Sequence, residues 1–122
     1  MKLLKKSNAS KKGFIMRNIT KEATEAFWNG TKFSKDNTSV HVDDSGNVYL
    51  SLYGNIIAYR EKDVLTISSR GRQTNTTKER LNGILGRYSY GVYQKKHKWY
   101  LADYTQSNKH DIEFYDGMEI KL

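Results

Sequence analysis

From residue 38 to residue 68 the apolar residues of this chain recur at every second position, and short polar segments interrupt the pattern. Val48, Leu50 and Leu52 are the clearest example, because this spacing places all three side chains on one face of a strand. The interruptions at residues 43–46 (Asp-Asp-Ser-Gly) and 54–55 (Gly-Asn) have the composition of hairpin turns. The pattern therefore predicts an antiparallel meander with one apolar face and one face rich in Tyr, Ser and Arg.

Two short helices are predicted, one on each side of this meander. The first is expected to begin with Thr20 as its N-cap and to stop before Gly30. The second is expected to begin at Thr76, in a capping box with Glu79, and to run to about Leu85.

The segments after the second helix alternate again and predict two more hairpins. One joins residues 88–94 to residues 98–101, and the other joins residues 112–115 to residues 118–122 across an Asp-Gly turn. The order helix, strands, helix, strands predicts the α+β class. We therefore expect an antiparallel β-sheet, made of the meander and the C-terminal hairpins, with two short helices on one face.

The length of 122 residues fits one small domain, which we place at residues 13–122. Residues 1–12 carry five lysines and little apolar content, so we expect a flexible basic tail there. That start has too few apolar residues for a signal peptide, and no later stretch is apolar enough to span a membrane. The chain has no cysteine, which excludes thiolate metal sites and makes the reducing cytoplasm the expected location.

Basic residues outnumber acidic residues by 21 to 13, which gives a formal net charge of +8. An excess of this sign favours polyanionic partners such as nucleotides and nucleic acids. His41, His97 and His110 do not have the spacing of a metal site, and no catalytic motif is present. We therefore expect no metal ion, no cofactor and no catalytic residue. A small basic ribonuclease that uses His97 with Arg87 or Arg70 stays open as an alternative.

The segment 68–80, Ser-Ser-Arg-Gly-Arg-Gln-Thr-Asn-Thr-Thr-Lys-Glu-Arg, is the strongest candidate for a binding site. A helix start carries partial positive charge and unpaired amides, and here two arginines and several hydroxyl groups precede it. Guanidinium groups bind phosphate through paired hydrogen bonds, whereas helix capping explains only the threonines. The expected phosphate-binding residues are Arg70, Gly71, Arg72, Thr74, Thr76, Thr77 and Arg80.

Aromatic residues next to basic residues recur along the strands and provide faces on which nucleobases can stack. We add Tyr53, Tyr93 and Trp99 to the site as stacking rings, and Arg87 as a further cation. Tyrosine in strands is also common for packing alone, and basic hairpin tips prevent aggregation of sheet edges. The aromatic residues therefore support a nucleotide site without proving one.

Three stretches resemble a widespread group of small phage-encoded proteins. They are residues 49–58 (Tyr-Leu-Ser-Leu-Tyr-Gly-Asn-Ile-Ile-Ala), residues 76–83 (Thr-Thr-Lys-Glu-Arg-Leu-Asn-Gly), and the basic hairpin of residues 93–96 before Trp99-Tyr100-Leu101. The resemblance covers residues 17–101. The chain departs from the group at Arg72, where the group carries tryptophan after the glycine.

The resemblance implies a small accessory protein of the host-cell cytoplasm, made to take over the host or to blunt its defences by binding rather than catalysis. Our leading hypothesis is a non-enzymatic protein that binds and sequesters a phosphate-bearing nucleotide, such as a cyclic or linear immune signal, or a short oligonucleotide. Enclosure of such a ligand favours a homo-oligomer with the pocket at an interface.

Three alternatives stay open beside this hypothesis. They are a sequence-tolerant DNA- or RNA-binding protein that uses its whole basic surface, an inhibitor of a host protein, and a small basic ribonuclease. They differ in one structural respect, namely whether the positive charge gathers around a cavity or spreads over an open face.

Overall fold

A computed structural model gives the structure of residues 17–106 and 111–122. The helices are α1 (Asn18–Asn29) and α2 (Asn75–Leu85), and a short 3₁₀ helix, η2 (Gly86–Tyr88), continues the second. The strands are β1 (Phe33–Lys35), β2 (Thr38–Val42), β3 (Val48–Leu52), β4 (Asn55–Glu61), β5 (Val64–Ile67), β6 (Tyr90–Lys95), β7 (Lys98–Asp103), β8 (Ile112–Glu113) and β9 (Met118–Lys121). The predicted basic tail at residues 1–12 lies outside the described residues.

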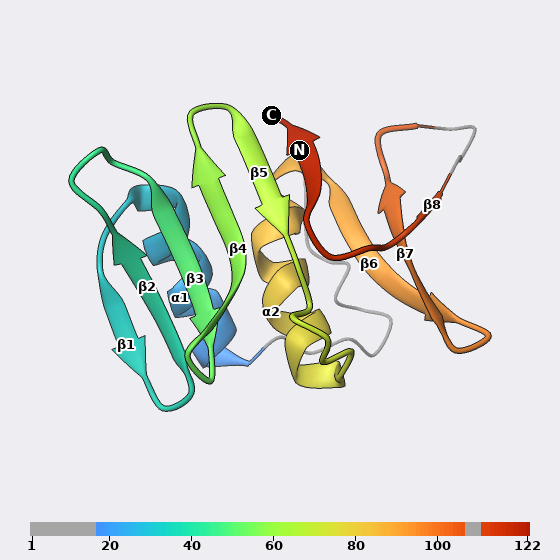
Figure 1. Cartoon of the computed structure of the whole chain (residues 1–122), viewed down its shortest axis with the longest axis horizontal. Helices are drawn as coiled ribbons and strands as arrows, with labels where there is room; N and C mark the ends of the chain where they lie inside the picture. Colours follow the sequence, from blue (N-terminus) through green and yellow to red (C-terminus); the bar gives the residue numbers. More distant parts are fainter. Residues whose placement is uncertain (1–16, 107–110) are drawn as a thin grey trace.

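The strands form two antiparallel sheets. The larger sheet has the order β1-β2-β3-β4-β5-β9, and the smaller sheet has the order β6-β7-β8. Figure 1 shows α1 behind β2 and β3, and α2 between the larger sheet and the β6–β7 hairpin. The chain is a small single α+β domain, as predicted, although its strands are divided between two sheets.

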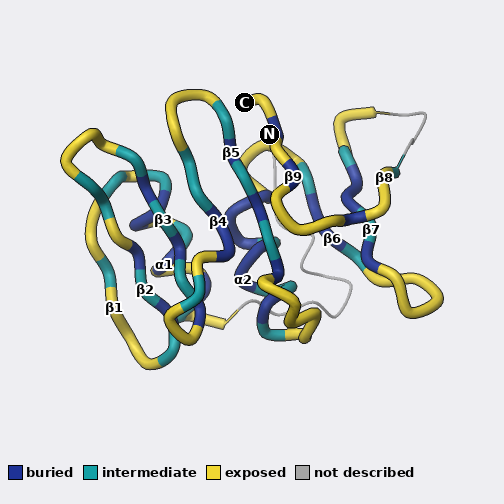
Figure 2. Tube along the Cα trace, in the orientation of Figure 1, coloured by how far each residue is buried: buried dark blue, intermediate teal, exposed yellow. Residues whose placement is uncertain are grey.

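The core lies between the helices and one face of the larger sheet. Val48, Leu50 and Leu52 are all buried along β3, as their alternation predicted. Phe27 from α1 and Ile84 from α2 pack against this face with no exposed surface. Figure 2 shows the buried segments in the strands and in α2, and the exposed segments in β1 and the turns. No helix formed by residues 17–106 or 111–122 lies over the outer face of the larger sheet.

The first helix begins before the predicted residue. α1 follows Arg17, and Thr20 is buried within its first turn instead of capping it. The predicted stop is confirmed, because Gly30 adopts the left-handed conformation (φ 70°) and its N–H reaches the carbonyl groups of Ala26 and Phe27.

The second helix also begins earlier than predicted, with its cap two residues before Thr76. Its cap is Thr74, whose Oγ1 accepts a hydrogen bond from the N–H of Thr77 at 3.1 Å. The expected capping box of Thr76 with Glu79 is wrong, because the Glu79 carboxylate accepts hydrogen bonds from the backbone N–H of Arg17 and from a neighbouring guanidinium instead.

The predicted C-terminal hairpin does not form. β8 pairs with β7 and β9 pairs with β5, so the Asp-Gly turn at residues 116–117 connects the two sheets. Met118 and Ile120 of β9 are buried opposite Ile67 and Leu65 of β5. Pairing with the exposed β8 would leave these side chains outside the core, and burial of apolar surface therefore decides the partner.

A β-bulge interrupts the pairing of β3 with β4. Leu50 lies opposite Ala58 and Ser51 lies opposite Ile56, which leaves Ile57 without a partner in the register. Ile57 and Ala58 are consequently both buried, although they are adjacent.

Arg60 of β4 also departs from the predicted arrangement of the sheet faces. Its side chain packs on the helix side of the sheet, with its guanidinium carbon 5.4 Å from the centre of the Trp28 ring. The expectation that arginine joins Tyr and Ser on the outer face is therefore wrong for this strand.

A buried arginine connects the two helices and the sheet. Arg80 of α2 is 2% exposed. Its Nη1 donates to Thr20 Oγ1 at 2.8 Å, and its Nε donates to Thr38 Oγ1 at 3.0 Å. Nη1 also forms an ion pair with Glu79 Oε1 at 2.6 Å. A buried charge is tolerated only when it is paired and hydrogen-bonded, and here the partners come from α1, α2 and β2.

The smaller sheet is attached to α2 by a side chain that replaces a neighbouring strand. The amide of Asn82 accepts a hydrogen bond from the N–H of Val92 at 2.6 Å and donates one to the carbonyl of Val92 at 3.0 Å. This pair of bonds satisfies the backbone of β6 on the side that β7 does not cover.

None of the helices among the described residues is of a length and apolarity suited to crossing a membrane.

Replacement of Arg80 by methionine should lower the free energy of unfolding by about 3 to 5 kcal/mol, because the buried hydroxyl groups of Thr20 and Thr38 and the carboxylate of Glu79 would all lose the guanidinium group that they contact. Urea denaturation followed by circular dichroism measures the change. Arg72→Met removes the same side chain from an exposed loop and should change stability by less than about 0.5 kcal/mol. A loss below about 1 kcal/mol for Arg80→Met would show that the network does not hold the fold together.

Candidate functional site

The loop between β5 and α2 forms one wall of a small cavity, and the β3–β4 turn forms the other. The cavity has a volume of about 170 Å³, and we call it the loop cavity. It brings together six of the residues predicted for the site, which are Tyr53, Arg70, Arg72, Thr74, Thr76 and Thr77. Leu52 and Ile57, both buried, also line it.

The two arginines of the loop cavity have no acidic partner. None of the ion pairs formed by residues 17–106 and 111–122 involves Arg70 or Arg72, and both residues are exposed. Their guanidinium groups are therefore available to a bound anion, without first breaking an internal salt bridge.

The start of α2 adds backbone donors to this cavity. The N–H groups of Asn75 and Thr76 find no acceptor within the part of the chain that the structure describes. The N–H of Thr77, in contrast, donates to the side chain of Thr74. The first turn of α2 contains no acidic residue. The positive end of the helix dipole is therefore not neutralised locally, which favours an anion at this position.

Asp116, on the turn before β9, is hydrogen-bonded to the loop that follows the neighbouring strand β5. Its Oδ1 accepts hydrogen bonds from the N–H and the Oγ of Ser69, at 2.7 and 2.8 Å, and its Oδ2 accepts one from the N–H of Gly71 at 3.1 Å. These donors flank Arg70, which adopts the left-handed conformation (φ 53°), as does Gly71 (φ 76°). A non-glycine residue in this conformation costs about 1 kcal/mol, and the three hydrogen bonds offset that cost.

The same hydrogen bonds perturb the acidity of this carboxyl group. Burial acts to raise the pKa of Asp116, but the donors on Ser69 and Gly71 together outweigh it, so the pKa lies below the usual value of 3.8. The ionised form is therefore the one that holds the loop.

A second hollow lies on the outer face of the sheet, directly beside the loop cavity. It has a volume of about 420 Å³, and we call it the tyrosine hollow after Tyr49 and Tyr59 in its wall. Ile57 and Arg70 line both spaces, so the two are neighbours across a single arginine side chain. Asp116 also lines the tyrosine hollow.

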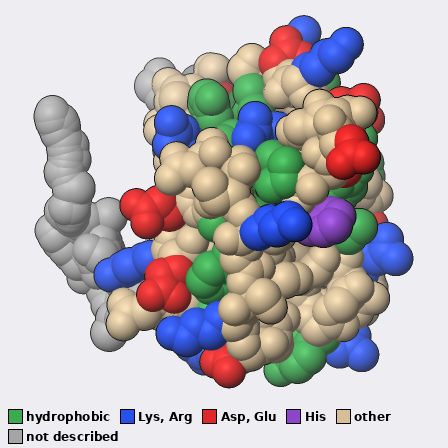
Figure 3. Space-filling model, turned by 90° about the vertical axis from the view of Figure 1, so that its left-hand side faces the viewer, with side chains coloured by type: hydrophobic (Ala, Val, Ile, Leu, Met, Phe, Trp, Pro, Cys, Tyr) green, Lys and Arg blue, Asp and Glu red, His purple; other side chains and the backbone are tan. Residues whose placement is uncertain are grey.

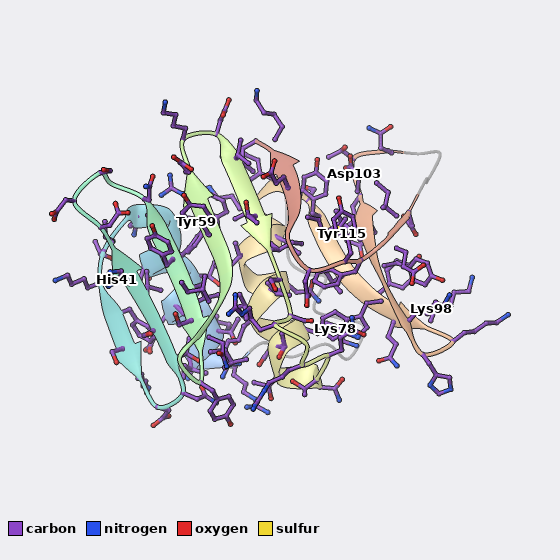
Figure 4. The ribbon with its side chains drawn as sticks, in the orientation of Figure 1. His41, Tyr59, Lys78, Lys98, Asp103 and Tyr115 are labelled. Carbon is purple, nitrogen blue, oxygen red and sulfur yellow. The ribbon has the colours of Figure 1, made fainter. Side chains whose placement is uncertain are left out.

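The tyrosines of this hollow are stacked across adjacent strands. The ring centres of Tyr49 and Tyr59 are 4.9 Å apart with an interplanar angle of 21°. The ring centre of His41 lies 5.8 Å from that of Tyr49. Figure 4 shows His41 and Tyr59 on the face of the sheet that is turned to the viewer, whereas Figure 1 shows α1 behind it. The rings thus line the face that lies opposite α1 and is covered by neither of the described α-helices.

Both hydroxyl groups are held by carboxylates. Tyr49 donates to Asp43 at 2.8 Å and Tyr59 donates to Glu61 at 2.7 Å. The hydrogen bond to Glu61 raises the pKa of Tyr59 to about 12, so its ring stays neutral at physiological pH.

Five of the predicted site residues do not line the loop cavity. Gly71 lies in the same loop, but its N–H is bonded to Asp116. Arg80 is buried in the network described above, and Trp99 is 3% exposed with its ring against Phe114. Tyr93 stacks on Tyr100 in the smaller sheet and donates its hydroxyl to Asp111. Arg87 lies 5.6 Å from the centre of the Trp28 ring. Charge and aromatic character alone did not separate these residues from those of the cavity.

The predicted site omitted Tyr49, Tyr59 and Asp116. The period-two alternation already placed the two tyrosines on the outer face, and this pattern is the sequence signal that indicates them. No comparable signal indicated Asp116, because the contact with Gly71 joins residues 45 positions apart.

The described residues contain no group of three or more His, Asp or Glu side chains that could hold a metal ion. His97, the histidine of the ribonuclease alternative, lies in the exposed β6–β7 turn with a left-handed backbone (φ 70°) and lines neither the loop cavity nor the tyrosine hollow.

Charge is mixed on the side of the molecule where β1 lies. Figure 3 shows basic and acidic side chains interspersed there, with no large area of one sign. Lys35 on β1, for example, pairs with Glu22 of α1 at 3.6 Å. On this side the net positive charge does not form a continuous basic surface.

One known protein family matches most of the chain. Residues 16–121 match the family described as Kyanoviridae Gp96 protein, which takes in both helices, both sheets and the loop cavity. The chain belongs to the Kyanoviridae Gp96 family. No curated protein and no solved structure matches it.

Membership of the Kyanoviridae Gp96 family identifies a small phage-encoded protein, as the sequence resemblance implied. The printed description names no ligand and no activity. In this member of the Gp96 family, the segment Thr-Thr-Lys-Glu-Arg-Leu-Asn makes structural contacts, since Arg80 joins the helices and Asn82 holds β6.

Asp116→Asn should lower the free energy of unfolding by about 1 kcal/mol at neutral pH, since an amide cannot accept all three hydrogen bonds and water replaces part of them. A carboxyl group whose folded pKa is depressed stabilises the fold above its unfolded pKa and loses that contribution as the pH falls through the folded value. The unmodified protein should therefore lose stability below about pH 4, and the variant should lose less over the same range.

Urea denaturation at several pH values measures both effects, and amide hydrogen exchange at Ser69 and Gly71 reports the loop itself. Asp103→Asn is the matched control, because Asp103 accepts two hydrogen bonds from Thr105 in the same manner, outside the loop. Exchange rates at Ser69 and Gly71 that are equal in the two variants would mean that Asp116 does not order the loop.

Proposed function

We propose that this protein binds, without converting it, a phosphate-bearing nucleotide in the loop cavity, and that it acts as a phage accessory protein by sequestering that ligand. The observation that carries the proposal is the pair of unpaired arginines, Arg70 and Arg72, beside the free amides at the start of α2. The guanidinium groups and the amides contact the phosphate, and the hydroxyl groups of Thr74 and Thr76 complete its hydrogen bonds.

Tyr53 supplies the stacking face for a base next to this phosphate. Tyr53 is 63% exposed and lies in the turn between β3 and β4. It lines the loop cavity from this turn, whereas the arginines line the cavity from the loop between β5 and α2. The N–H of Tyr53 donates to the carbonyl of Asn37 at 2.8 Å, and the left-handed backbone (φ 53°) turns the side chain at a fixed position. An exposed aromatic ring at this position offers a face on which a base can stack.

Local binding is favoured over sequence-tolerant binding of nucleic acid by the entire surface. The unpaired loop arginines lie together, whereas Arg80 is buried and Lys35, Lys98 and Lys121 lie close to acidic side chains. A site of this kind loses affinity at one or two residues, whereas a diffuse basic surface loses a little at each cation.

Arg72→Gln should weaken nucleotide binding by roughly tenfold to a hundredfold, because it removes a charge-assisted contact with the phosphate. Arg70→Asn should act similarly, and asparagine is the right replacement because it tolerates the left-handed backbone of that position. A thermal-shift panel of mononucleotides, cyclic dinucleotides, cyclic trinucleotides and ADP-ribose derivatives identifies the probe, and calorimetry with that probe gives the affinities.

Arg87→Gln is the matched control, since it removes one exposed arginine that lies over Trp28 and outside the loop cavity. It should leave the affinity unchanged. Equal losses at Arg72 and Arg87, with a steep salt dependence, would point instead to nucleic-acid binding over the whole surface. Stabilisation by no member of the panel would contradict the proposal.

A further inference from the structure

The tyrosine hollow continues the loop cavity on the other side of Arg70. Both spaces share this arginine and Ile57, and the β-bulge at Ile57 is where the two meet on the sheet. A ligand whose phosphate lies on Arg70 therefore has one end towards Tyr53 and the other towards Tyr59. The arrangement offers an aromatic ring on each side of a central cation.

The two spaces differ in charge in a way that separates a phosphate from a base. The loop cavity is lined by two arginines and by no acidic residue. The tyrosine hollow is lined by Arg70 and by Asp116, and carboxylates hold both of its tyrosine hydroxyls. The carboxylates of the hollow would repel a phosphate, whereas they would not repel a neutral nucleobase. The phosphate thus belongs in the loop cavity and an uncharged ring in the hollow.

The shape of the hollow follows from the small residues beside the stacked tyrosines. Thr66 lies directly opposite Tyr59 in the register of β4 with β5, and Ser68 and Gly117 line the same wall. These short side chains leave room on the open side of the Tyr59 ring. Ile56, which is 42% exposed, adds apolar surface at the edge. A flat apolar ring fits between these walls and gains by leaving water.

From this geometry we propose that the ligand holds two nucleosides joined through phosphate, with one base on Tyr53, the phosphate on Arg70 and Arg72, and the second base in the tyrosine hollow beside Tyr59. The inference rests on the proposed nucleotide function and deepens it, because it names the class of nucleotide. Two sources share this chemistry, namely a free linear or cyclic dinucleotide and a segment of a single strand.

Calorimetry should compare adenosine monophosphate, the 5′-phosphorylated linear dinucleotide of adenosine, cyclic diadenylate and a longer deoxyadenosine single strand, all on the complete chain. We expect the linear or the cyclic dinucleotide to bind at least about tenfold more tightly than the monophosphate, since a second stacked base contributes that much. If only dinucleotides show this gain, the ligand is a free signal. If the longer strand shows it as well, the site accepts a strand segment.

Tyr59→Thr should remove the advantage of the dinucleotide over the monophosphate and leave the affinity for the monophosphate unchanged. Tyr59→Phe keeps the ring and loses only the hydrogen bond to Glu61, so it should keep the advantage. Tyr93→Thr is the matched control, because Tyr93 is also a stacked tyrosine whose hydroxyl is held by a carboxylate, in the smaller sheet. Thermal unfolding of each variant verifies that it is folded.

Equal affinity for the monophosphate and the dinucleotides, or an advantage that survives Tyr59→Thr, would overturn this inference. If affinity for the monophosphate still falls in Arg72→Gln, the proposed nucleotide function stands without it. If no compound of the series binds, both proposals fail.

Discussion

The fold depends on a charged side chain placed where charge is most costly. Arg80 is almost fully buried, and burial lowers the pKa of its guanidinium group from the ordinary value of arginine. It stays acceptable because hydroxyl groups of α1 and β2 and the carboxylate of Glu79 surround it. Glu79 lies on α2 itself, but the two hydroxyl groups come from α1 and β2, so both helices and the sheet must assemble before Arg80 can make all of these bonds. Glu79 extends the connection, since it also accepts a hydrogen bond from the backbone N–H of Arg17 at the start of α1.

The arginines of the chain are of two kinds, namely those that make contacts within the fold and those that are left for a ligand. Arg80 holds elements together and offers nothing to a ligand, while Arg60 and Arg87 lie over the aromatic rings near α1. Arg70 and Arg72 make no ion pair with any described residue. The high net charge of the chain is therefore a poor guide to function by itself, because several cations are occupied by packing. What distinguishes the loop is that its cations, hydroxyl groups and free amides meet at one cavity.

The loop is shaped by a residue far away in the sequence. Asp116 bonds on both sides of Arg70 and holds that residue in a conformation that side chains other than glycine rarely adopt. The position of Asp116 depends in turn on β9, which pairs with β5 and places the preceding turn beside the loop. Because Arg70 borders both the loop cavity and the tyrosine hollow, the pairing of the last strand also determines how these two spaces are joined.

The sequence by itself determined those features of the protein that depend on short-range patterns. The period-two residues predicted the meander and its buried face, Gly30 predicted the end of α1, and the arginines and threonines before α2 marked the loop as a candidate site. Those features follow from side-chain spacing and backbone preference, which act over a few residues. Only the tertiary structure decided that β9 joins β5 instead of β8, that Arg80 is buried while Arg72 is exposed, and that Asp116 and the tyrosines of the outer face lie beside the loop. These outcomes depend on which apolar residues can be buried together and on which polar groups then find partners, and contacts between residues more than forty positions apart settle them.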